Sequence, residues 1–165
     1  MKNSFPTLVV NTGPIISLIA ATGDLEILKN LYSEVHVPLE VAEELTFNNS
    51  TKFGAEVFSN ADFLLVEKKH LIINPMLLNS LDTGEASVIQ LALNKSIDYV
   101  SIDEAVGRRI ARLNALRLNG SLGILVKAKK IGIINSVKDC LTNMKEKGIY
   151  LSDNLIAQVL NESGE

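Results

Sequence analysis

Residues 7–20 read TLVVNTGPIISLIA, a short apolar run that breaks at an Asn-Thr-Gly-Pro turn and then resumes as a longer apolar stretch. A run of about four β-branched and apolar residues that ends at turn residues is typical of a strand buried on both faces. The stretch from Ile15 to Ala21 is long enough to continue as a helix. This segment therefore predicts a buried strand followed by a helix, the unit from which parallel sheets are built.

The same alternation of extended and helical patterns recurs along the rest of the chain. Pro38 keeps the residues before it extended, and Asp82 with Glu85 has the spacing of a capping box at a helix start. Residues 46–51 are expected to form a loop, and residues 71–80 an irregular connection. We expect strands near residues 34–37, 63–66, 98–102 and 115–118, and helices near residues 25–31, 39–45, 52–60, 82–95, 106–113, 120–130, 136–147 and 152–162.

Strands that alternate with helices indicate a three-layer α/β/α domain with a mainly parallel central sheet of about five strands. No repeat, low-complexity tract or long linker divides the sequence, so we expect one domain over residues 1–165. Its core is expected to span residues 7–134, followed by C-terminal helices within residues 136–162.

The composition excludes several classes of protein. The 165 residues include one cysteine, Cys140, and two histidines, His36 and His70. An intrachain disulfide, metal sites of the Cys₄, Cys₂His₂ or His₃ type, and a haem-binding cysteine pair are therefore excluded, and any metal ligands are expected to be oxygens. No apolar run reaches the roughly 18 to 20 residues of a membrane span. Because residues 11–14 also interrupt the apolar run that could imitate a signal peptide, we expect a cytoplasmic protein without membrane contact.

Charge is distributed unevenly along the sequence. Residues 1–104 contain six basic and 14 acidic residues, whereas residues 105–138 contain eight basic residues and no acidic one. Two interpretations of this basic segment stay open: a contact for nucleic-acid phosphates, or a pair of solvated helix faces. With 5% aromatic residues and no tryptophan, a platform that stacks several bases is not expected.

Two polar residues come directly after buried strands of the expected sheet, Asn11 after the first and Asp103 after the strand at residues 98–102. The carboxyl ends of parallel strands meet at one edge, and helical acids such as Glu43, Glu44 and Glu85 could converge there. Such oxygens are the ligands that Mg²⁺ or Mn²⁺ prefers. Each residue also has a structural alternative: a helix cap for Asp103, a capping box for Glu85, a solvated face for the glutamates near residue 43, and an Asx turn for Asn11.

Other chemistries fit the sequence poorly. A receiver-like phosphoacceptor domain needs paired acids after its first strand, and this chain has VVNTGP there. A metal-free ribonuclease with two histidines would use His36, which lies in an apolar strand, and His70, which lies beside two lysines. The sequence also has no Gly-x₄-Gly-Lys-Ser/Thr phosphate-binding loop.

Five ordered segments carry a resemblance to a known family: VVNTGPIISLIA, VHVPLEVAEEL, LDTGEASVIQLALN, YVSIDEAVGRRIARL and NGSLGILVKAKKIGII. Together they resemble a PIN domain, and more narrowly an uncharacterised prokaryotic PIN-like branch. In that branch Gly-Arg-Arg follows the strand-end acid and a Gly-Ser/Thr-Leu-Gly turn opens the next helix. The resemblance runs from about residue 8 to residue 134, most of the chain.

The resemblance implies a ribonuclease in which an acidic site holds Mg²⁺ or Mn²⁺ and a metal-activated water cuts single-stranded RNA. Its four acidic positions fall on Asn11, Glu44, Glu85 and Asp103, which would be both catalytic residues and metal ligands. Glu43 and Glu104 are neighbours that could supplement this set. The small hydroxyl residue beside the first acid falls on Thr12. RNA contacts are expected at Thr12, Arg108, Arg109, Arg112 and Lys127.

The departure from the family pattern is Asn11, which stands where the family has aspartate. Asparagine offers one neutral carbonyl oxygen, so a bound Mg²⁺ loses a full negative charge among its ligands. Weaker metal binding and slower cleavage follow if the protein is a nuclease. The alternative is a catalytically impaired module that binds nucleic acid or a protein. The resemblance further implies the toxin of a toxin–antitoxin pair, with an antitoxin protein and a homodimer as partners.

Overall fold

A five-stranded parallel sheet forms the centre of the computed structural model, which describes residues 4–47 and 53–165. The strand order is β3-β2-β1-β4-β5, and every neighbouring pair is parallel. The strands are β1 (Thr7–Val10), β2 (Glu34–Val37), β3 (Leu64–Val66), β4 (Tyr99–Ser101) and β5 (Arg117–Leu118). The predicted three-layer α/β/α fold with a parallel sheet is confirmed.

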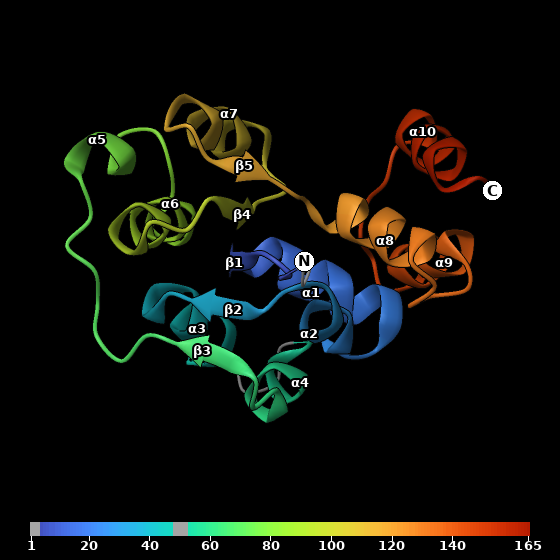
Figure 1. Cartoon of the computed structure of the whole chain (residues 1–165), viewed down its shortest axis with the longest axis horizontal. Coiled ribbons are helices and arrows are strands. Elements are labelled where there is room, and N and C mark those ends of the chain that lie inside the picture. The colour runs from blue at the N-terminus through green and yellow to red at the C-terminus, as the bar shows by residue number, and fades with distance from the viewer. Residues whose placement is uncertain (1–3, 48–52) are drawn as a thin grey trace.

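Helices cover both faces of this sheet. Helix α6 packs against β1 and β4, α7 packs against β5, and α2 packs against β2. Figure 1 shows α5 at one end of the long axis and α8 to α10 gathered at the other. The helices are α1 (Thr12–Thr22), α2 (Glu26–Leu31), α3 (Leu39–Thr46), α4 (Ala55–Asn60), α5 (Pro75–Leu78), α6 (Thr83–Lys95), α7 (Ala105–Leu113), α8 (Ser121–Lys130), α9 (Val137–Glu146) and α10 (Asp153–Ser163).

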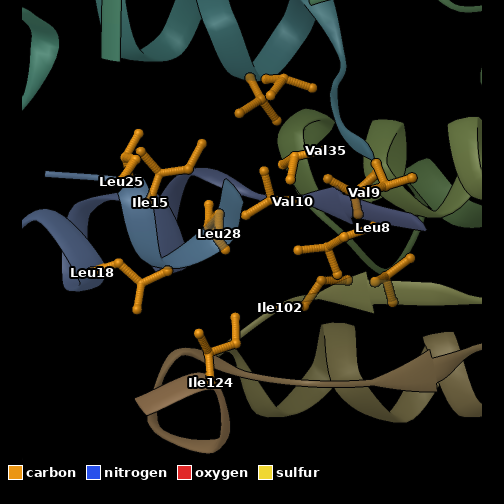
Figure 2. Packing of buried hydrophobic residues seen from close by; sticks show 14 of the residues in the cluster. Leu8, Val9, Val10, Ile15, Leu18, Leu25, Leu28, Val35, Ile102 and Ile124 are labelled. Carbon is orange, nitrogen blue, oxygen red and sulfur yellow. The ribbon is translucent and has the colours of Figure 1, made fainter. Parts of the chain in front are cut away.

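The central strand β1 lies in the middle of the hydrophobic core. Leu8, Val9 and Val10 are all fully buried, as expected for a strand with helices on both faces. Figure 2 shows them among side chains of other elements, including Ile15 of α1 and Ile124 of α8. Each such side chain contributes roughly 1.5 to 3 kcal/mol on burial. This packing fixes the carboxyl end of β1, where Asn11 follows.

The structure also departs locally from the sequence-based expectations. The fifth strand was expected over residues 115–118 but contains only Arg117 and Leu118, because Ala115 has φ +59° and a left-handed residue cannot continue a strand. Within the expected irregular connection, Asn74 accepts a hydrogen bond from the Met76 N–H, and Pro75 begins the single turn α5. The expected loop at residues 46–51 falls mostly outside the described residues.

Asn11 and Asp103 lie at the same edge of the sheet. Val10 is opposite Ser101 in the β1–β4 pair, and the Asn11 N–H donates to the Ser101 carbonyl at 3.1 Å. The chain leaves β1 toward β2 on one side, while β4 lies on the other side, so the strand order reverses between β1 and β4. In sheets of this kind the ligand site is the crevice at such a reversal, beyond the carboxyl ends of the strands. In the described part of the chain, no helix has the length and apolar character to cross a membrane.

Candidate active site

Asn11 links β1 to α1 with a buried side chain, 6% exposed. Its Oδ1 atom is buried and has no hydrogen-bond partner, and the side chain does not cap α1. The Asx-turn alternative requires this oxygen to accept a backbone N–H, so the turn does not explain Asn11. A buried amide oxygen without a partner costs about 1 to 3 kcal/mol, which a bound cation or donor would recover.

Glu44 reaches the same place from α3. The Thr12 hydroxyl donates to Glu44 Oε2 at 2.9 Å, so the residue after Asn11 orients this carboxylate. A Cβ atom built on Gly84 would lie 2.9 Å from Glu44 Oε2, 3.4 Å from Asn11 Oδ1 and 3.4 Å from Asp82 Oδ1. Oxygens from three separate elements therefore surround the backbone of Gly84, and a side chain there would displace them.

Asp82, which was not among the predicted site residues, caps α6 by accepting the Glu85 N–H at 2.8 Å. The Glu85 side chain does not return the bond to Asp82 but packs against Gly107 of α7, so only half of the expected capping box forms. Glu85 is 6% exposed, and its Oε1 atom has no hydrogen-bond partner. Burial raises the pKa of Glu85, and the negative charge of Asp82 raises it further, with smaller contributions from Glu104 and Glu44.

Asp103 has both carboxylate oxygens engaged. Oδ1 accepts the Ser121 N–H and Oδ2 accepts the Ser121 hydroxyl, each at 2.8 Å. The capping alternative for Asp103 is therefore correct in kind, but the capped helix is α8 and not α7, which directly follows it. The N-cap residue of α7 is Glu104, whose side chain makes no capping bond.

Three glycines provide the space that these acids occupy. Gly84 faces Glu44, Gly107 faces Glu85, and Gly120 faces Asp103, with ideal Cβ positions 2.9, 2.8 and 2.9 Å from the respective carboxylate oxygens. The same Cβ on Gly120 would lie 2.6 Å from Arg108 Nη1. All three glycines lie in segments quoted for the resemblance, but no local pattern ties each glycine to its acid, because the members of each pair lie far apart in the sequence.

The two neighbouring acids, Glu43 and Glu104, occupy different places. Glu43 Oε1 lies 3.2 Å from His70 Nε2, and Glu40 Oε1 lies 3.4 Å from the Nδ1 atom of the same ring. Glu43 therefore points toward His70, in a pocket of about 600 Å³ that Glu44 also lines. Glu104 is exposed and lines, with Asp103, a separate groove of about 840 Å³.

The residues that the sequence predicts to contact RNA also lie in different places. Arg108 and Arg112 line the groove with Asp103, while Arg109 and Lys127 are not part of its lining. Lys127 Nζ instead lies 5.4 Å from the centre of the Tyr32 ring. Burial raises the pKa of Tyr32 to about 12, so the contact is a cation over a neutral ring.

The donor set fits a weakly held hard cation. No three His, Cys, Asp or Glu side chains among residues 4–47 and 53–165 are placed to hold a metal ion together. Nevertheless, Asn11 Oδ1 and Glu85 Oε1 are buried oxygens without hydrogen-bond partners, and the side chains gathered here offer oxygen donors alone, the type that Mg²⁺ and Mn²⁺ select. The chemistry of the ligands thus matches these ions, while the separation of the carboxylates favours low affinity.

Comparison with protein families agrees with this arrangement. The model of the DUF3368 family, described as a PIN domain, matches residues 7–165. The chain belongs to the PIN-domain family. No curated protein matches the sequence. PIN domains generally depend on a divalent metal ion and have nuclease or nucleic-acid-binding roles, so this PIN domain has a role of that class.

Proposed function

We propose that this PIN domain is a metal-dependent ribonuclease that hydrolyses phosphodiester bonds of single-stranded RNA, with activity weakened by Asn11. The observation that carries the proposal is the pair of buried oxygens without partners, Asn11 Oδ1 and Glu85 Oε1, beside Glu44 at the carboxyl edge of the sheet. Buried polar atoms in folded proteins almost always have a partner, and a bound ion is one explanation for an exception.

Asn11, Glu44, Glu85 and Asp103 would hold Mg²⁺ or Mn²⁺, which when bound supplies charge stabilisation to a phosphodiester and lowers the pKa of water. Thr12 orients Glu44, and Ser121 orients Asp103. The raised pKa of Glu85 makes its carboxylate a ready partner for positive charge, because a cation relieves the repulsion from Asp82 and Glu44. Arg108 and Arg112 are placed to bind substrate phosphates.

A second candidate is a nucleic-acid-binding module without catalytic activity. The neutral side chain of Asn11 favours it, since this residue replaces a charged ligand in the family pattern. The toxin role, an antitoxin protein and a homodimer are also part of the proposal and rest on the family resemblance alone. A cytoplasmic location is part of it too and rests on the hydropathy pattern of the sequence.

The decisive experiment is cleavage of a panel of single-stranded RNAs by the native chain, Asn11→Asp and Asp103→Asn, with Mn²⁺, Mg²⁺ or EDTA. We expect slow cleavage by the native chain, faster cleavage by Asn11→Asp by about 10- to 100-fold, and loss of activity in EDTA, since each 1.4 kcal/mol changes a rate tenfold. Asn60→Asp, on the exposed end of α4, makes the same chemical change away from the site and should leave cleavage unchanged.

Each alternative outcome has a distinct meaning. Cleavage by Asn11→Asp alone would show that asparagine at position 11 abolishes nuclease activity. Nucleic-acid binding without catalysis would then be the native function. No cleavage by any variant, under any metal condition, would overturn the nuclease proposal. Activity that survives Asp103→Asn unchanged would show that Asp103 only caps α8.

A further inference from the structure

The groove beside Asp103 extends well beyond the candidate metal ligands. Its volume is about 840 Å³, and its walls come from the start of α7, the turn that opens α8, the segment between α9 and α10, and α10 itself. Figure 1 shows these C-terminal elements gathered at one end of the molecule. A groove that starts at a candidate catalytic carboxylate and runs along an exposed surface can hold a chain longer than the bond being cut.

One wall carries the positive charge. Arg108 and Arg112 are four residues apart on α7 and therefore lie on the same face of this helix, whereas Arg109 points elsewhere. The Arg108 guanidinium donates weakly to the Ile102 carbonyl at 3.4 Å, which directs it toward Asp103. Within the described residues, neither arginine has a carboxylate within ion-pair distance, so both are available to phosphate oxygens.

Three acidic side chains also line the groove. Asp103 and Glu104 lie at the candidate active site, and Glu162 lies on α10, where it accepts a hydrogen bond from Gln158 at 3.0 Å. The arginines are the cationic side chains of this lining.

The groove also presents an aromatic ring. Tyr150 lies in the segment between α9 and α10, lines the groove and is 89% exposed. Leu155 of α10, which also lines the groove, is partly exposed as well. An open ring beside arginines has the chemistry by which single-stranded nucleic acids are bound, with bases stacked on aromatic faces and phosphates held by cations.

We infer that this groove binds single-stranded RNA on one side of the cleavage point, with Arg108 and Arg112 on its phosphates and Tyr150 stacked against a base. The inference rests on the proposed function and adds to it the strand path and a residue that the charge pattern did not identify. The low aromatic content excludes a platform for several bases, but one ring is sufficient for one base. The C-terminal helices thus contribute to substrate binding as well as to the fold.

Direct binding tests this inference without cleavage. The dissociation constant of a fluorescein-labelled 12-nucleotide RNA would be measured by anisotropy in EDTA for the native chain, Tyr150→Ala, Tyr150→Phe, Arg112→Ala and Arg109→Ala. We expect Tyr150→Ala to bind about 5- to 100-fold more weakly and Tyr150→Phe to bind like the native chain. Arg112→Ala should weaken binding and lower the salt dependence by about 0.7 per lost phosphate contact, whereas its neighbour Arg109→Ala should do neither.

A second readout reports the stacking itself. The chain has no tryptophan, so Tyr150→Trp introduces a single indole whose fluorescence should be quenched when unlabelled RNA is added. A native-like affinity of Tyr150→Ala together with unquenched Tyr150→Trp would overturn the inference and leave the nuclease proposal standing. If the native chain binds no RNA and Asn11→Asp cuts none, the proposed function fails, and this inference fails with it.

Discussion

Asn11 and Asp103 follow neighbouring strands of one sheet and lie at the same edge, yet their side chains are used in opposite ways. The Asn11 oxygen is buried and has no hydrogen-bond partner, and it does not cap α1. Both Asp103 oxygens are held by Ser121, so this carboxylate joins β4 to the start of α8. The Asn11 side chain therefore makes no hydrogen bond that supports the fold, whereas the Asp103 side chain makes two.

This difference indicates which position can change without loss of structure. Replacement of an aspartate by asparagine at position 11 removes a charge beside Glu44 and Asp82 without breaking a described hydrogen bond. The same replacement at position 103 would keep the bond from the Ser121 N–H but would reverse the bond with the Ser121 hydroxyl, because an amide nitrogen donates and does not accept. A functional charge is therefore most easily lost where it has no structural role, and this chain carries asparagine at the position of that kind.

The largest expected effect tests directly whether Asn11 and Asp103 differ in their structural role. Asp103→Ala should lower the free energy of unfolding by about 2 to 3 kcal/mol, because it removes a helix cap and two hydrogen bonds to a charged group. Asn11→Ala should change the same quantity by less than about 1 kcal/mol, because relief of the unpartnered buried oxygen offsets the lost packing of the side chain. Urea unfolding in EDTA measures both values.

The matched control at position 103 is Asp103→Asn. Its Oδ1 atom can still accept the Ser121 N–H, and its amide can donate to the Ser121 hydroxyl, so stability should stay within about 1 kcal/mol of the native chain. Equal losses in Asp103→Ala and Asn11→Ala would show that the two positions are structurally equivalent, and the comparison would be wrong.

Much of the fold was predictable from the sequence because its signals are local. The break after Val10 and the paired Asp82 and Glu85 mark element ends that the structure bears out, apart from the short fifth strand. Placing Asn11 and Asp103 at one edge needed only the rule for parallel sheets. The bond from Asp103 to Ser121 joins residues 18 positions apart and depends on how β5 returns beside β4, which no local pattern encodes.

The different positions of the arginines on α7 could be predicted in part from the sequence. Gly107 and Ala111 are the buried residues of α7, so helical spacing alone separates Arg108 and Arg112 from Arg109. The contact of Glu43 with His70 was not accessible in this way, because the connection that carries His70 has no periodic pattern.

The next largest effect concerns the glycines that leave space for the acidic side chains. Gly107→Ala should lower the free energy of unfolding by about 1 to 3 kcal/mol, because its Cβ would lie 2.8 Å from both Glu85 Oε1 and Ile102 Cγ2 in a packed interior. Gly13→Ala is the control, since a Cβ there meets no atom within 4 Å and alanine favours the helix. Thermal and urea unfolding should rank Gly107→Ala below the native chain and Gly13→Ala at or above it. A tolerated Gly107→Ala would mean that Glu85 can turn away freely.

The smallest expected effect concerns the pH dependence that Glu85 imposes on the metal-free fold. Burial, with the charge of Asp82, raises the pKa of Glu85 above its usual 4.5, so the folded chain holds this proton more tightly than the unfolded chain. That contribution to stability is fully present below pH 4.5 and is lost as the pH rises through the folded pKa. Glu85→Gln cannot ionise and should therefore gain stability relative to the native chain over this rise, measured by urea unfolding in EDTA. A difference that stays constant with pH, or that favours the native chain as the pH rises, would show that Glu85 is no more costly to ionise than a solvent-exposed acid. Its unpaired oxygen would then be no argument for a bound cation, and the case for a metal at this edge would rest on Asn11 alone.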